Sequence, residues 1–255
     1  GDMNADGSVQ PVGGIDAKVR GANNRDCTHV AIPGKCTSFV YDTAIMEGFG
    51  PITEIQVFTI DKFDDAKALA QQEKSELINK SIASFDRIVG IYTKNPSTFS
   101  TTIRHPKVVT LLEEIVKDTP NHLSAKILLE YTKGQMQKTL SLHGSTEFIE
   151  QRAYSITQVI VDGKVSKIEG LTPNKVVESV NLLRRSKERL DQRTWKWSGE
   201  LIKFATLLNQ LQTNPPQSTT RHRKLVSEIN AALREVNAER DQLFESPEAM
   251  EELLQ

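Results

Sequence analysis

The segment covering residues 9–33, VQPVGGIDAKVRGANNRDCTHVAIP, constrains the fold more than any other part of the chain. A strand pattern ends at Gly13 and Gly14, and a helical pattern with apolar residues on one face covers residues 15–25. A β-branched strand follows over residues 28–32 and ends at a proline. Because glycine lacks a Cβ atom, the pair permits a sharp turn from strand to helix. The segment therefore predicts a strand–helix–strand unit.

Lys18 lies near the start of this predicted helix. The positive end of a helix dipole disfavours a second positive charge, so we expect the neutral amine to be stabilised there. A lysine that gives up its proton can act as a general base. The alternative is an exposed helix lysine without a catalytic role.

The motifs around Lys18 resemble a known family of enzymes. PVGGIDAKVRGA (residues 11–22) followed by CTHVAIP (27–33) is similar to the C-terminal part of the proteolytic domain of Lon-type serine peptidases. The family pattern there is P-(I/V)-G-G-x-x-x-K, a helix, and a strand ending in Ile-Pro. The hairpin GDMNADGSVQPVGG (1–14) and the segment ITEIQVFTIDKFDDAKALA (52–70) also resemble the family, so the likeness covers about residues 1–70.

This resemblance implies a Ser–Lys dyad, with Lys18 as the general base that activates a serine nucleophile. It further implies a protein or peptide substrate, a homo-oligomer formed through the proteolytic domain, and no cofactor. The family serine stands upstream of the lysine in a Gly-Pro-Ser-Ala-like context. Ser8 lies on the hairpin loop without that context, and no other serine in the sequence has it. We therefore expect the chain to begin within the proteolytic domain and to be inactive as a peptidase by itself.

The character of the sequence changes at about residue 72, beyond which no strand is predicted. Residues 1–71 are expected to form an α+β part, the C-terminal part of the Lon-like domain, and residues 72–255 an α-helical accessory domain. Two helical hairpins are predicted there, 106–137 and 172–244, the second a long antiparallel pair. The first resembles a single tetratricopeptide-like hairpin. The fold class is thus predicted to be predominantly α.

Composition excludes few functions. Charged residues make up 25% of the chain and the net charge is −1, an ordinary balance that points to neither nucleic acid nor a membrane. Two basic clusters, residues 184–196 and 221–224, could suggest nucleic-acid binding. Acidic residues interleave the first cluster, which is typical of a solvated helix face, so no nucleic-acid partner is predicted. The sequence contains no run of 18 apolar residues, so no membrane span is predicted. The cytoplasm is the favoured compartment.

Two further motifs resemble ligand sites, but neither is predicted to bind a ligand. Cys27 and Cys36 flank the strand at 28–32, and two separate buried thiols are favoured over a disulfide. With only His29 nearby they make no metal site. The segment 33–37, PGKCT, imitates the end of a phosphate-binding loop, but it lacks the upstream glycine and has Cys36 directly after Lys35.

The sequence leaves two main functional hypotheses, and a third reading, nucleic-acid binding by the basic helix, stays open beside them and predicts steep salt dependence. The first is a Lon-like peptidase half-domain followed by a helical domain that positions substrates or mediates oligomerisation. The second is a non-enzymatic scaffold in which a degenerate peptidase fold and helical hairpins bind a protein partner.

Overall fold

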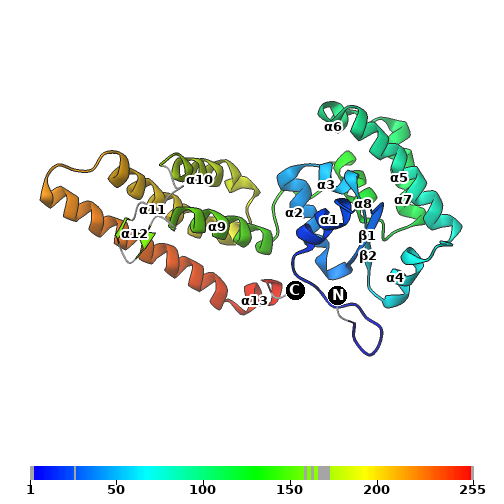
Figure 1. The fold of residues 1–255 in the computed structure, drawn as a ribbon, viewed down its shortest axis with the longest axis horizontal. Coiled ribbons are helices and arrows are strands. Elements are labelled where there is room, and N and C mark those ends of the chain that lie inside the picture. Colours follow the sequence, from blue (N-terminus) through cyan, green and yellow to red (C-terminus); the bar gives the residue numbers. More distant parts are fainter. Residues whose placement is uncertain (1–2, 26, 158–159, 162–163, 166–172, 254–255) are drawn as a thin grey trace. The chain divides into compact units, whose positions relative to one another are not determined.

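The computed structural model describes residues 3–25, 27–157, 160–161, 164–165 and 173–253 (Figure 1). These residues are predominantly helical, as predicted from the sequence. They divide into two compact units, Gly1–Lys138 and Thr139–Leu254, and each unit is described by itself below.

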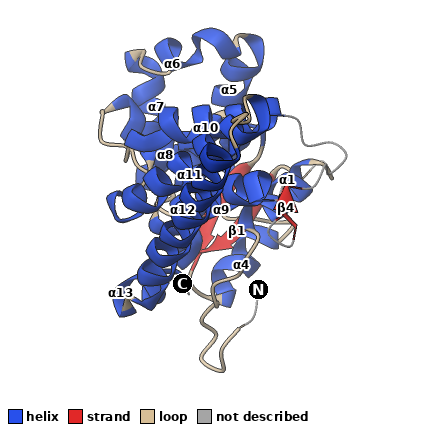
Figure 2. Ribbon diagram, turned by 90° about the vertical axis from the view of Figure 1, so that its left-hand side faces the viewer, coloured by secondary structure: helices blue, strands red, loops and turns tan. Residues whose placement is uncertain are grey.

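In the first unit, helices surround a small parallel sheet of two strands (Figure 2). Its elements are α1 (Ile15–Asn23), β1 (His29–Pro33), the 3-10 turn η1 (Gly34–Cys36), α2 (Thr37–Glu47), α3 (Gly50–Glu54), β2 (Gln56–Ile60), α4 (Phe63–Ala70), α5 (Glu76–Lys94), the 3-10 turn η2 (Pro96–Thr98), α6 (Phe99–Thr102), α7 (Pro106–Asp118) and α8 (Leu123–Thr132).

The two strands of this unit confirm the predicted strands in kind and nearly in position. β1 and β2 pair in parallel, with Val30 opposite Val57 and Ile32 opposite Thr59. Parallel neighbours need a crossover connection, and α2 with α3 supplies it. The second strand is predicted over residues 53–60 but begins at Gln56, because the segment from Gly50 to Glu54 forms α3 instead.

The turn between α7 and α8 takes the place of a third strand beside β2. The Thr59 N–H donates to the Asn121 carbonyl at 2.8 Å, and the Asn121 side-chain amide donates back to the Thr59 carbonyl at 3.0 Å. The Val57 N–H donates to the Ser124 hydroxyl at 2.9 Å. These bonds satisfy backbone groups that a strand edge would otherwise leave unpaired.

One apolar core therefore joins helices on both sides of residue 71. The buried members include Ile15, Ile32, Val57, Phe85, Ile88, Leu112, Leu123 and Ile127. The division between units consequently falls at Lys138 rather than at residue 71, the boundary predicted from the sequence. The predicted hairpin over 106–137 is present as α7 and α8, and it packs against α5 and β2.

The second unit is built from helices with one very short hairpin. Its elements are α9 (Leu142–Thr157), β3 (Ile160–Val161), β4 (Lys164–Val165), α10 (Pro173–Ser186), the 3-10 turns η3 (Lys187–Arg189) and η4 (Gln192–Thr194), α11 (Trp195–Thr213), α12 (Thr219–Glu245) and α13 (Pro247–Leu253). β3 and β4 pair antiparallel, so the expectation of no strand beyond residue 71 is wrong at this point. Residue 172, the expected start of the long hairpin, lies outside the described residues.

The first arm of the predicted 172–244 hairpin is not one helix, because residues 187–194 interrupt it. Leu190 is fully buried and extended, with φ −83° and ψ 149°. The Leu140 N–H donates to the Arg189 carbonyl at 2.6 Å, and the Asp191 N–H donates to the Ser145 hydroxyl at 2.8 Å. These bonds to the segment at the start of α9 replace the bonds that a continuous helix would make within itself.

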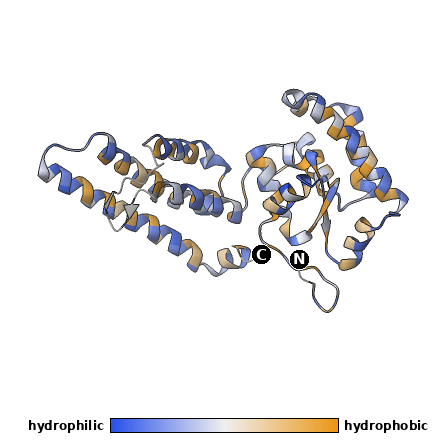
Figure 3. Cartoon of the chain, viewed as in Figure 1, coloured by the Kyte–Doolittle hydropathy of each residue, from blue (hydrophilic) through white to orange (hydrophobic). Residues whose placement is uncertain are grey.

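The antiparallel pair is instead formed by α11 and α12, joined across residues 214–218. Apolar and polar residues alternate along the ribbon of α12, as expected for an amphipathic helix (Figure 3). The buried seam contains the predicted residues Trp197, Leu201, Phe204, Leu208, Leu225, Ile229 and Val236. Lys196 at the start of α11 pairs with Glu239 near the end of α12 at 2.6 Å, which agrees with an antiparallel arrangement.

Candidate functional site

The carboxyl ends of β1 and β2 lie at the same edge of the parallel pair. β1 ends at Pro33 and β2 at Ile60, which are opposite each other in the register. Gly34 and Asp61 follow directly. In open α/β sheets, ligands usually bind at the edge formed by the carboxyl ends of the strands. This edge is therefore the candidate site.

The turn before Lys18 is held at this same edge. Gly14 precedes α1 with φ 66° and ψ 37°, a left-handed conformation that suits glycine. The Val12 N–H donates to the Cys36 sulfur at 3.5 Å, and the Cys36 S–H donates to the Val12 carbonyl at 3.6 Å. Because Cys36 belongs to the turn that follows β1, the Gly13-Gly14 turn is fixed beside the end of that strand.

The strand predicted before the glycines is reduced to isolated bridges. Met3 bridges Val9 and Ser8 bridges Lys62, both antiparallel. The predicted hairpin is present, since the Gly7 N–H donates to the Asn4 carbonyl at 3.0 Å and the Asn4 N–H to the Ser8 carbonyl at 2.9 Å.

Lys18 lies on the first turn of α1, as the sequence predicted, and it is exposed. Its Nζ atom donates a hydrogen bond of 2.6 Å to the Gly13 carbonyl. Among the side chains that the structure describes, which do not include that of Asp16, no carboxylate forms an ion pair with this ammonium.

A crevice of about 330 Å³ opens at the same sheet edge. Its polar lining consists of Gly34, Lys35, Thr37, Thr59, Asp61 and Lys126. The Thr37 hydroxyl donates to the Gly34 carbonyl at 2.6 Å, whereas the two lysines form no ion pair among the described residues. Lys18 is not part of this lining.

Gly34 permits the close approach of two segments in this crevice. A Cβ atom at position 34 would collide with the Asp61 carboxylate, so any larger residue there forces the carboxylate to move. The Gly34–Cys36 segment forms a 3-10 turn and not a glycine-rich phosphate cradle.

The cysteines and His29 take ordinary structural places. Both cysteines are free, as predicted, but only Cys36 is buried. Cys27 is exposed, so the expectation that both thiols are buried is wrong for it. His29 is engaged through its ring nitrogens with the Thr28 hydroxyl at 2.9 Å and the Leu69 carbonyl at 3.1 Å. Within the described ranges, no group of three or more His, Cys, Asp or Glu residues could hold a metal ion.

His122 is a buried polar residue that the sequence reasoning missed. Its ring lies between Phe58 and Phe85, with centroid distances of 4.3 and 4.7 Å. Its Nδ1 atom accepts the Ala125 N–H at 3.3 Å, so Nε2 carries the proton and donates to the Gln56 side chain at 3.0 Å. Burial lowers the pKa of His122 from 6.5 to about 3.

Gln56 is the signal that could have revealed this network. It is the polar first residue of β2, it precedes the apolar Val57 and Phe58, and it is almost fully buried. Its amide also donates to the Asp86 carboxylate at 2.8 Å. The network joins β2, α5 and the start of α8, and it supports the sheet without reaching the crevice lining.

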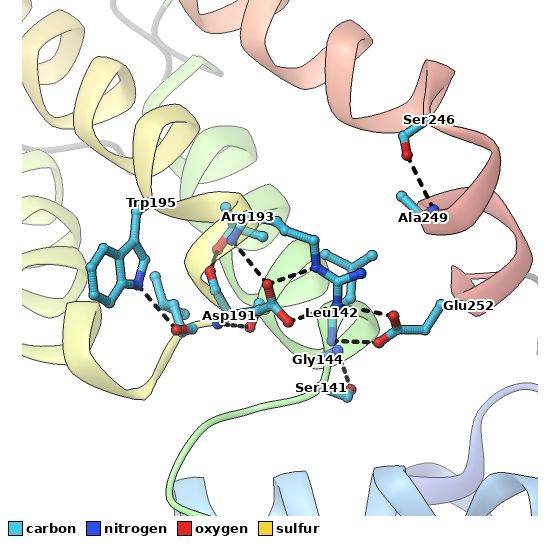
Figure 4. A network of polar contacts seen from close by, with 12 residues as sticks. Ser141, Leu142, Gly144, Asp191, Arg193, Trp195, Ser246, Ala249 and Glu252 are labelled. Carbon is cyan, nitrogen blue, oxygen red and sulfur yellow. Dashed lines mark hydrogen bonds and ion pairs between the residues drawn. The ribbon is translucent and has the colours of Figure 1, made fainter.

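In the second unit, several residues of the basic cluster at 184–196 contact their own surroundings, and Figure 4 shows the contacts of Arg193. Arg193 pairs with Asp191 at 2.7 Å and with Glu252 at 2.9 Å. The Lys187 ammonium lies 5.2 Å from the centre of the Trp195 ring. These contacts fit the interpretation of a solvated, salt-bridged helix face.

No protein-family model matches the chain, and neither a curated protein nor a solved structure matches it. Among the described helices, none combines the length and the apolar character that crossing a bilayer requires.

Proposed function

We propose that the first unit carries the lysine half of a Ser–Lys peptidase centre of the Lon type. The observation that carries the proposal is the position of Lys18 on the first turn of α1, after the left-handed Gly14. The turn that precedes it is tied to the end of β1 through Val12 and Cys36. The Gly13 carbonyl holds its ammonium, and no described carboxylate neutralises it. The resemblance over residues 1–70 adds the identity of the partner, a serine.

In this mechanism the neutral Lys18 amine removes the proton from a serine hydroxyl as the oxygen attacks the peptide carbonyl. The resulting ammonium gives that proton to the departing amine, and an acyl-enzyme remains. Lys18 then removes a proton from the water that attacks the ester, and it returns this proton to the serine oxygen as the acid is released. The serine of this scheme is not one of the serines in this sequence, so the 255 residues by themselves are proposed to be inactive.

The crevice at the sheet edge is proposed to hold substrate next to this centre. Lys35 and Lys126 provide two cations and Asp61 one carboxylate within about 330 Å³. Such a lining can fix the orientation of a peptide through its polar groups. The helical second unit is proposed to contact protein substrates or other copies of the chain.

The second candidate is the non-enzymatic scaffold. It is favoured by one specific observation: the described partner of the Lys18 ammonium is a backbone carbonyl and not a hydroxyl. In a scaffold this hydrogen bond only closes the first turn of α1.

The decisive experiment uses the protein expressed from the complete reading frame that contains this sequence. Peptide hydrolysis is expected, and Lys18→Ala should lower kcat by a factor of about 10² to 10⁴, the usual contribution of a general base. Lys18→Arg should lower kcat to a similar extent, because a guanidinium does not release its proton. Arg20→Ala is the matched control on the same helix, since Arg20 pairs with Glu47 and has no assigned role.

Two results separate the candidates. Unchanged hydrolysis in Lys18→Ala would exclude the peptidase role of Lys18. Hydrolysis absent from the unaltered protein, together with retained folding and partner capture in Lys18→Ala, would support the scaffold.

A further inference from the structure

A second groove in the first unit is lined by positive charge. It has a volume of about 630 Å³ and lies between α5, α6 and the start of α7. Arg87, Arg104 and Lys107 contribute three cations to its lining. The His105 ring also lines it, and its Nδ1 atom accepts the Lys107 N–H at 3.3 Å. No Asp or Glu is among the described residues that line it.

The cations of this groove differ from their neighbours in having no carboxylate partner among the described residues. On the same helices, Lys80 pairs with Asp118 at 2.9 Å, and Glu113 pairs with Lys133 at 2.8 Å. The Arg104 guanidinium lies 4.8 Å from the centre of the Tyr131 ring, a contact that holds the side chain without neutralising its charge. The groove therefore keeps an uncompensated positive potential.

The rest of the lining is apolar. Ile91 and Leu111 are half-buried and Val108 is buried, so aliphatic surface lies beside the cations. A ligand that fits must combine negative charge with an aliphatic group. No Phe, Tyr or Trp is among the described lining residues, so the groove offers no such ring on which nucleic-acid bases could stack.

We propose that this groove binds an acidic segment of a partner protein that carries an aliphatic side chain among its carboxylates. Arg87, Arg104 and Lys107 bind the carboxylates, and the aliphatic side chain packs on Ile91 and Leu111. The volume suits a few side chains held between rigid helices. The proposal does not depend on any catalytic role of Lys18, because Lys18 is not part of this groove.

The test uses the full chain and a fluorescein-labelled octapeptide of glutamates with one central leucine. Fluorescence anisotropy should show saturable binding that weakens as salt rises. The double variant Arg87→Glu/Lys107→Glu should bind at least about tenfold more weakly, since repulsion replaces attraction. Lys117→Glu, an exposed lysine of α7 outside the groove, should bind like the unaltered protein.

Circular dichroism of each variant checks that it folds. Both charge reversals of the double variant should leave the fold intact, because Arg87 and Lys107 are exposed. Equal binding by the double variant would overturn the assignment. Equal affinity for an all-glutamate octapeptide would overturn the role of the apolar lining. Tighter binding of an octathymidylate than of the peptide would overturn the choice of a protein segment as ligand.

Discussion

The Nε2 atom of His122 lies 3.0 Å from the Oε1 atom of Gln56, and both side chains are buried. The imidazole thereby connects the N-cap position of α8 to the first residue of β2. This connection requires the neutral ring, because Nδ1 is already an acceptor for the Ala125 N–H.

The first prediction concerns the pH dependence of stability that His122 imposes. Burial lowers its pKa from 6.5 to about 3, so the folded ring is neutral where the unfolded ring is protonated. The unfolded state binds more protons between these values, and stability falls as pH drops from 6.5 towards 3. The slope due to this group is at most about 1.4 kcal/mol per pH unit.

Urea unfolding followed by circular dichroism at about pH 7, 5.5 and 4.5 measures this slope. His122→Asn keeps a capping acceptor at the start of α8 and removes the titrating group, so its slope should be shallower. Both tryptophans, Trp195 and Trp197, lie in the second unit, and their fluorescence records that unit separately. Identical slopes for the two proteins would contradict the prediction.

The second prediction concerns the glycine turn before Lys18. Gly14→Ala should destabilise the first unit by about 1 kcal/mol, because alanine is strained in the left-handed conformation at φ 66°. Gly13→Ala is the matched control, since Gly13 lacks a positive φ and the methyl group of an alanine there would meet no other atom within 4 Å. Gly14→Asn should lose less stability than Gly14→Ala. Equal losses of stability in Gly13→Ala and Gly14→Ala would argue against strain at Gly14.

The third prediction concerns the two thiols. In the native protein a thiol-specific reagent should modify one equivalent rapidly, at the exposed Cys27, and a second only after denaturation, at the buried Cys36. Cys27→Ser should remove the rapid phase. A rapid phase that persists in that variant would mean that Cys36 is accessible.

The fourth prediction compares two carboxylates that bind Arg193. Asp191 accepts from the Arg193 N–H and Nε at 2.9 Å each, and its removal in Asp191→Ala should cost about 1–2 kcal/mol. Glu252→Gln should cost less than about 1 kcal/mol, because the Arg193 and Glu252 side chains are 44% and 42% exposed. Tryptophan fluorescence during urea unfolding measures both, and a larger loss in Glu252→Gln would reverse the ranking.

Acid should weaken the Asp191 contribution. The hydrogen bond from the Arg193 side chain is the main reason that the pKa of Asp191 is lowered from 3.8. The stability it provides is therefore present above pH 3.8 and is lost as pH falls through the lowered value. The difference between the unaltered protein and Asp191→Ala should shrink in that range.

Local signals explain what could be predicted from the sequence. Some residues start or end an element within a few positions of themselves, so the sequence predicts the elements beside them correctly. These residues are Gly14 before α1, Pro33 at the end of β1 and the prolines after Asn214. The position of Lys18 on the first turn follows from the same signals. Its bond to the Gly13 carbonyl does not, because a side-chain rotamer leaves no trace in a sequence pattern.

Contacts between distant residues explain what could not be predicted. The apolar spacing of α7 and α8 defines a buried face but not its partner, so it does not reveal their packing on β2 through Asn121 and Ser124. The interruption at Leu190 depends on Leu140 and Ser145, which are distant in the sequence, while the local spacing remains helical.

The unequal edges of the two strands have a practical consequence. The α7–α8 turn covers the outer edge of β2, whereas β1 pairs with β2 and forms no other ladder among the described residues. A strand edge without a second ladder offers backbone groups to which a further strand can pair. The residues of β1 are half-buried or buried and Pro33 has no N–H, so any such pairing is limited to residues 29–32.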